Sequence, residues 1–164
     1  MQIATDPFHA EAKPLQSVPD SQTKRALALA LLARADAGKL QAVLNQYWPH
    51  ISFRSLKPAA TGLVMLRGRI GGDGAPFNVG EATVSKAVIE LDGGTRGYGQ
   101  CLGRDAKKAE LAAIFDALWQ QEEARVEQLV LTPIRDALAT MRQTKATQTA
   151  ATKVDFFTLV RGED

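Results

Sequence analysis

The residues most able to do chemistry gather around a glycine-rich stretch, RIGGDGAPFNVGEATVSK, which runs from Arg69 to Lys86. Glycine-rich loops cradle phosphates when a strand precedes them and a helix with a Lys-Ser or Lys-Thr start follows. No such pair follows Gly74, and the next segment alternates as a strand does. The same strand excludes a Rossmann dinucleotide turn. We therefore interpret Gly71–Gly74 as the turn of a β-hairpin.

Three arginines are candidates for contacts with a phosphate or with a partner's carboxylate. Arg67 and Arg69 are two residues apart in a predicted strand, so their side chains point to one face. Guanidinium groups bind both kinds of anion as planar forks, although a solvated sheet face explains the same pattern. Arg104 precedes Asp105, and the pair could form a site, but we interpret Asp105 as the N-cap of a helix.

Other catalytic or metal-binding patterns are weak. Glu110 and Asp116 are six residues apart and do not share a helix face, so they form no obvious acid–base pair. Cys101 has no histidine near it in the sequence, and we interpret it as a structural thiol. With only His9 and His50 besides, we expect no metal or cofactor to be bound by this chain alone.

The elements that must position these residues predict an α+β fold. Two N-terminal helices begin near Asp20 or Ser21 and near Lys39, and the first is expected to stop near Gly38. An antiparallel β-meander with glycine-rich hairpins follows, with turns at Gly71–Gly74 and Asp92–Gly94. Helical periodicity then returns from Asp105 to Met141, bent or restarted at Pro133, before an extended C-terminal segment.

We divide the chain into a flexible tail (1–19), a single α+β domain (20–142), and a linker with a C-terminal docking segment (143–164). The stretch RQTKATQTAATK is weakly patterned and predicts an extended linker. The apolar ending VDFFTLVRGED either closes the domain's own core or docks into another subunit. Its candidate docking residues are Val154, Phe156, Phe157, Leu159 and Arg161.

The composition narrows the class of protein. Hydrophobic residues make up 45% and charged residues 23% of the 164, which is typical of a soluble globular protein. The formal net charge of +2 is too balanced to imply a nucleic-acid or membrane partner. The apolar run Ala26–Ala33 is shorter than the roughly 20 residues that a membrane span needs. A lone cysteine allows no internal disulfide, so we expect a cytoplasmic protein.

Two blocks of unusual residues resemble one family. TGLVMLRGRIGGDGAPFNVGEATVSKAVIELDGGTRGYGQCLGRDAKKAELAAIFDAL resembles the central signature of the G subunit of the bacterial carbon–phosphorus lyase core complex. TKVDFFTLVRGED resembles the C-terminal end of that family, and together the match covers about residues 20–164. Lys86 stands where the family often has arginine, Lys108 where it often has histidine, and Leu159 where methionine is common. Lys86 keeps the charge but loses the planar fork.

The resemblance implies a non-catalytic or accessory subunit of a cytoplasmic, multi-subunit phosphonate transferase. Its other subunits would be the H, I and J subunits, of which the nucleosidase-like I subunit is the expected neighbour. That complex supports the displacement of adenine from ATP by a phosphonate, which gives ribose 1-methylphosphonate 5-triphosphate. ATP is then a co-substrate of the complex. The resemblance also suggests that Arg67, Arg69 or Arg104 reaches the substrate's phosphates, and that the terminal segment and the glycine-rich hairpin pack on partners.

Two other classes of function remain open from the residues. A stand-alone, homodimeric α+β module could bind an anionic metabolite through the arginine face. Its apolar C-terminal segment would then pack on the domain's own core. An enzyme in its own right would require activity of the isolated chain, which no motif in the sequence favours strongly.

Overall fold

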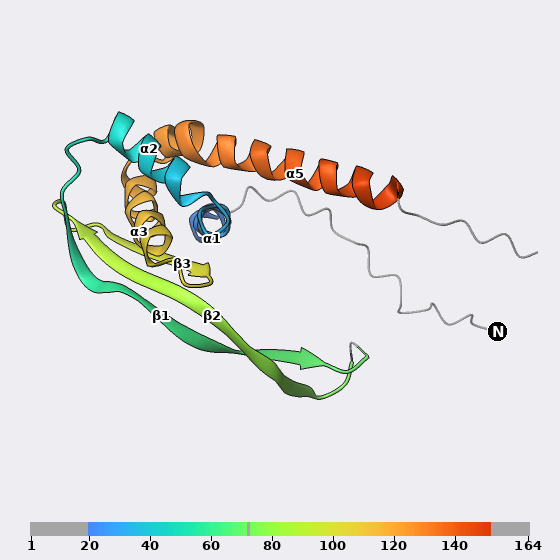
Figure 1. Cartoon of the computed structure of the whole chain (residues 1–164). Helices are drawn as coiled ribbons and strands as arrows, with labels where there is room; N and C mark the ends of the chain where they lie inside the picture. The colour runs from blue at the N-terminus through green and yellow to red at the C-terminus, as the bar shows by residue number, and fades with distance from the viewer. Residues whose placement is uncertain (1–19, 72, 152–164) are drawn as a thin grey trace, which may run out of the picture.

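The computed structural model describes residues 20–71 and 73–151 and confirms the α+β class (Figure 1). Its elements are α1 (Ser21–Leu32), α2 (Ala37–Tyr47), β1 (Phe53–Arg69), β2 (Pro76–Leu91), β3 (Arg96–Leu102), α3 (Ala106–Gln121), α4 (Glu123–Val126), the π-helical turn η1 (Glu127–Leu131) and α5 (Thr132–Ala151). The predicted tail (1–19) and the candidate docking residues Val154, Phe156, Phe157, Leu159 and Arg161 lie outside the described residues.

Aspartate N-caps fix where the first three helices begin. Asp20 accepts a hydrogen bond from the Thr23 amide at 2.7 Å, which confirms the predicted cap and lowers the pKa of this carboxyl. Asp36 caps α2 in the same way, at 2.9 Å from the Lys39 amide. Because this cap starts α2 at Ala37, Gly38 lies inside that helix, and the expectation that it ends the first helix is wrong.

The three strands form one antiparallel sheet in the order β1-β2-β3. The glycine-rich stretch is a hairpin turn, as predicted: the Gly74 amide donates to the Ile70 carbonyl at 3.0 Å. Gly71 has φ of 63°, a conformation that glycine adopts without a steric penalty. The second hairpin turns at Asp92–Gly94, where the Leu91 amide donates to the Thr95 carbonyl at 2.9 Å.

The first hairpin extends well beyond the rest of the sheet. β3 pairs with β2 only from Glu90 to Val84, so residues 63–71 and 73–83 form a ribbon of two strands, which we call the distal arm. Figure 1 shows the arm reaching away from the helices, with its turn at the far end. Seven residues of β1 lie in the arm, which corresponds to a length of roughly 20 Å.

Helix α3 forms the centre of the core. One face of the sheet packs on it, and α1 and α2 pack on it from other sides. A helix that is covered all round is apolar all round. The buried residues of α3 accordingly run almost without interruption: Ala109, Leu111, Ala112, Ala113, Ile114, Phe115, Asp116, Ala117, Leu118 and Trp119.

Small residues bring β3 and α3 into close contact. A Cβ atom placed on Gly97 would lie 1.8 Å from the Ala113 carbonyl oxygen, and one on Gly99 would lie 1.9 Å from that of Ala109. These two glycines therefore mark a close approach of two backbones, one of the reasons for glycine inside a strand. At Gly62, by contrast, nothing lies within 4 Å of the added atom.

The helical run after Glu122 is longer than the sequence suggested. The irregularity expected near Pro133 is observed as the π-helical turn η1, which ends at Leu131. The expectation of an extended linker is wrong for residues 143–151, which continue α5. Threonine hydroxyls in this stretch donate to the carbonyl four residues earlier, as Thr144 does to Thr140 at 3.0 Å, and the alanines favour a helix.

The close contact between β3 and α3 yields a first prediction. The substitution Gly97→Ala should lower the free energy of unfolding by about 3 kcal/mol, because the backbone of α3 must move to admit a methyl group. Urea unfolding followed by tryptophan fluorescence measures this, since Trp48 and Trp119 are buried. Gly62→Ala is the matched control and should cause no loss of stability. Equal stability of the two variants would contradict the packing described here.

Candidate functional site

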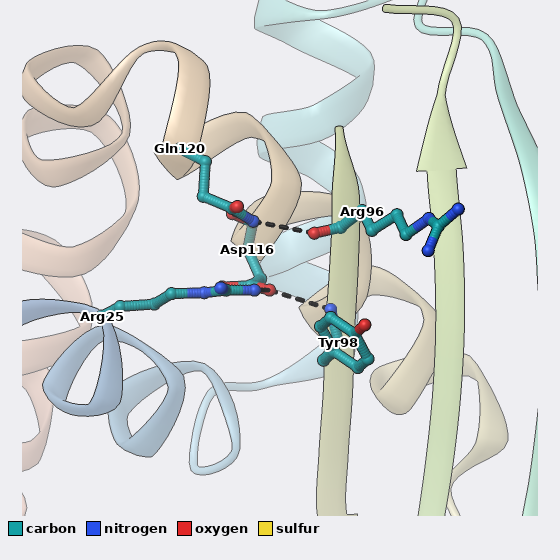
Figure 2. A network of polar contacts seen from close by, with 5 residues as sticks. All are labelled: Arg25, Arg96, Tyr98, Asp116 and Gln120. Atoms are coloured by element: carbon teal, nitrogen blue, oxygen red, sulfur yellow. Dashed lines mark hydrogen bonds and ion pairs between the residues drawn. The ribbon is translucent and has the colours of Figure 1, made fainter. Parts of the chain in front are cut away.

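Asp116 of α3 is a buried carboxylate that accepts three hydrogen bonds (Figure 2). Its side chain is only 1% exposed although it carries a charge, and its neighbours in α3 are apolar. Arg25 of α1 binds both of its carboxylate oxygens, with Nε donating to Oδ1 at 2.8 Å and Nη2 donating to Oδ2 at 2.7 Å. The backbone amide of Tyr98 in β3 also donates to Oδ2, at 2.8 Å. One carboxylate therefore joins α1, α3 and β3.

This network also bonds the free backbone groups at the β3 edge of the sheet. The hydrogen bond from Leu91 to Thr95 sets which residues of β3 are bonded to β2, and alternation then directs the backbone groups of Arg96 and Tyr98 away from β2. Asp116 accepts from the Tyr98 amide, and Gln120 Nε2 donates to the Arg96 carbonyl at 2.8 Å. Side chains of α3 thus bond to the backbone groups that an edge strand would leave open.

The role of Asp116 is structural. Arg25 stays a cation there, because the hydrogen bond to Asp116 raises the pKa of the guanidinium further. The ion pair of Asp116 with Arg25 was not predicted from the sequence. A single carboxylate within the apolar run LAAIFDALW was the available signal, because a buried charge requires a partner.

The outer face of the sheet, opposite α3, carries most of the sheet's positive charge. Glu90 accepts hydrogen bonds from Arg96 and Arg54, and these lower the pKa of its carboxyl. Lys57 and Lys86 lie on the same face by register, and no ion pair within residues 20–71 and 73–151 involves either lysine. Both line a cleft of about 500 Å³ between α1 and the sheet, together with Tyr98 and Gln100. The cleft has the charge to hold an anion.

The distal arm carries exposed apolar side chains on both of its faces. Ile70 at the turn is 75% exposed, Leu63 is 62% exposed and Val79 is 60% exposed. Met65, Leu66 and Phe77 are also exposed. Contiguous apolar surface of this kind marks a site of interaction rather than ordinary scatter.

The structure brings two of the three candidate arginines together. Arg67 and Arg69 are two residues apart at the end of β1, opposite Asn78 and Pro76, and both are exposed. Arg69 donates to the Gly74 carbonyl of the turn at 3.2 Å. Arg104 lies at the foot of the arm, directly before Asp105, which caps α3 as predicted. The length of the arm therefore separates it from the other two, and their contacts with a phosphate or partner stay a prediction.

A second apolar surface runs along the helices. A groove of about 620 Å³ lies between α2 and the η1–α5 segment. Its apolar lining residues include Val43, Leu129, Pro133, Ile134, Ala137, Leu138 and Met141. Arg34 and Lys39 border it.

Cys101, possible metal ligands and possible membrane spans were also considered in the sequence. Cys101 is 2% exposed, burial raises the pKa of its thiol, and Sγ donates to the Asp105 carbonyl at 3.4 Å, which fits a structural thiol. No group of histidine, cysteine, aspartate and glutamate side chains in residues 20–71 and 73–151 could hold a metal ion. No helix in the same ranges is long and apolar enough to cross a membrane.

Comparisons with known proteins point to one family. The family described as phosphonate metabolism protein PhnG matches residues 23–162. The chain is also 48% identical, over 135 residues, to alpha-D-ribose 1-methylphosphonate 5-triphosphate synthase subunit PhnG of Rhizobium meliloti (strain 1021). That alignment covers 82% of this chain and 86% of the relative.

The network at Asp116 yields a second prediction. The substitution Arg25→Ala should lower the free energy of unfolding by about 3 kcal/mol, because it leaves a buried carboxylate without its cation. Lys24→Ala is the matched control at the neighbouring position. It removes only the exposed pair with Glu123, whose atoms are 3.4 Å apart, and should cost about 0.5 kcal/mol or less. Equal losses in urea unfolding would show that the buried pair does not stabilise the fold.

Proposed function

The chain belongs to the PhnG family of phosphonate metabolism proteins, and on this premise we propose that it is an accessory subunit of ribose 1-methylphosphonate 5-triphosphate synthase. The family match extends over residues 23–162, so it includes the sheet, its distal arm and all the helices from α3 onward. The curated relative is itself a subunit of that synthase, by its name. The proposed role is in organophosphonate catabolism.

One observation carries the proposal of an accessory role: the distal arm. Isolated ribbons of two strands are marginally stable in water, and this one exposes Leu63, Ile70 and Val79 to solvent. A chain that worked alone would gain nothing from such a surface. A chain that works in a complex can bury it against a neighbour, and the burial stabilises both.

The proposed neighbours are the H, I and J subunits of the carbon–phosphorus lyase core complex, with the nucleosidase-like I subunit in closest contact. In this proposal the complex transfers a phosphonate to the ribose C1 of ATP and releases adenine. ATP is a co-substrate of the complex, and the catalytic groups reside in the partners. The arm, the groove along α5 and residues 154–164 are the surfaces that we propose for docking.

The cleft beside α1 favours a second candidate function. Lys57 and Lys86 line it with the Tyr98 side chain, and its volume of about 500 Å³ lies within the range of small-molecule sites. A module that binds an anionic metabolite would use these groups. Such a module would work as a stand-alone protein, so the two candidates differ in whether the chain needs its partners.

Co-expression with the I subunit, followed by size-exclusion chromatography, tests the proposal. The full-length chain should co-elute with that subunit, and deletion of residues 153–164 should weaken the association. Adenine release from ATP by the four-subunit complex should fall at least tenfold when this chain is left out. A full-length chain that elutes alone and folded, beside a separate partner, would favour the anion-binding module instead.

A further inference from the structure

We propose that an extended segment of another subunit pairs with the outer edge of β1 along the distal arm and adds a strand to the sheet. The proposal rests on the proposed function, because it requires a partner subunit. It goes further by identifying the contact as backbone pairing and by stating the chemistry of the segment: apolar and acidic side chains in alternation. Strand addition to an open edge is an established mode of recognition between proteins.

The two edges of the sheet differ in whether their backbone groups have hydrogen-bond partners. The β3 edge is bonded by Asp116 and Gln120 of α3, as described above. β1 forms the other edge, and no strand among the described residues lies beyond it. An edge left unpaired is a template for another chain unless the protein blunts it.

Only half of the β1 edge is blunted. Next to the core, β1 contains Lys57 and Pro58, and its pairing with β2 shifts register twice before Ala60. Lysine, proline and bulges are the usual means of preventing edge pairing. From Ala60 to Leu66 the register runs without a break, and this stretch contains neither lysine nor proline. The open part of the edge, Ala60–Leu66, therefore includes the part of the distal arm nearest the core, and the register shifts again between Leu66 and Arg67.

The hydrogen-bond pattern identifies the free backbone groups. Leu91 donates to Thr95 and Gly103 donates to Thr83, so the odd-numbered residues of β2 are bonded to β3 or point to that side. The even-numbered residues must then bond to β1, and these include Ala82 and Val84, which oppose Val64 and Gly62. By alternation, the amide and carbonyl groups of Leu63 and Met65 point away from β2. No strand among the described residues lies on that side of β1 to bond these groups.

Side chains on the arm indicate what the added strand would carry. Paired residues share a face, so Val64 and Leu66 lie on one face of the arm, with Ala82 and Gly80 opposite them. Leu63, Met65, Arg67 and Arg69 lie on the other face by alternation. A strand beside β1 would extend the first face with apolar side chains. It would place its remaining side chains beside Arg67 and Arg69.

Charge favours carboxylates at those remaining positions. β1 carries four charged residues, Arg54, Lys57, Arg67 and Arg69, and all of them are cations. Glu81 lies opposite Met65 on the β2 side of the arm, and Asp73 lies in the turn, so neither is on the β1 edge. A neighbouring strand with acidic residues near its end would meet the arginines as planar forks.

Hydrogen exchange of the assembled complex and of the isolated chain tests the pairing. The amides of Leu63 and Met65 should exchange at least tenfold more slowly in the complex. Those of Gly62 and Val64, already bonded to β2, should change less. If Leu63 and Met65 exchange equally fast in an intact complex, strand addition is wrong while the proposed function stands. If no complex forms, both are wrong.

Proline variants test the same point without resolving single amides. Met65→Ala keeps the outward amide and Met65→Pro removes it, so the proline variant should bind the partner at least tenfold more weakly than the alanine variant. Glu81→Pro is the matched control, because it removes an outward amide on the β2 side of the arm and should not weaken binding. Equal binding by the two Met65 variants would overturn the proposal. Circular dichroism tests whether each variant is folded. If a proline variant does not fold, the hydrogen-exchange experiment on the unsubstituted chain decides whether strand addition occurs.

Discussion

The fold depends on one buried carboxylate. Asp116 satisfies the Arg25 guanidinium and the Tyr98 amide at once, so α1, α3 and the edge of β3 are held in a single arrangement. The glycines of β3 allow this, because only a strand without side chains at Gly97 and Gly99 can lie close enough to α3. Charge and close packing thus act on the same interface.

This arrangement makes the sheet asymmetric. One edge and one face are bonded or covered by α3, whereas the outer face and the β1 edge remain open. The open parts carry the cations Lys57, Lys86 and Arg67 and the exposed apolar side chains of the arm. Stability and interaction are therefore assigned to opposite sides of the same three strands, which is consistent with a subunit that folds around α3 and presents the rest of the sheet to its neighbours.

Several features of the fold could be predicted from the sequence, because each depends on the conformational preference of one or a few neighbouring residues. The Gly71–Gly74 turn, the caps at Asp20 and Asp105 and the irregularity at Pro133 follow from the conformational limits of single residues. The ion pair of Arg25 with Asp116 could not be predicted, because its members are 91 residues apart. The helix at residues 143–151 was missed because threonine disfavours helices on average, and only the bonds to preceding carbonyls show that it is tolerated.

An open strand edge also has a cost for the cell that makes the protein. The stretch from Ala60 to Leu66 has no proline or lysine and exposes apolar side chains, which are the features that promote self-association between copies. A copy without a neighbour therefore presents a surface suited to aggregation and proteolysis. Synthesis at the same time as the proposed partner would keep that edge covered, so one unpaired hairpin edge favours coordinated expression of the two chains.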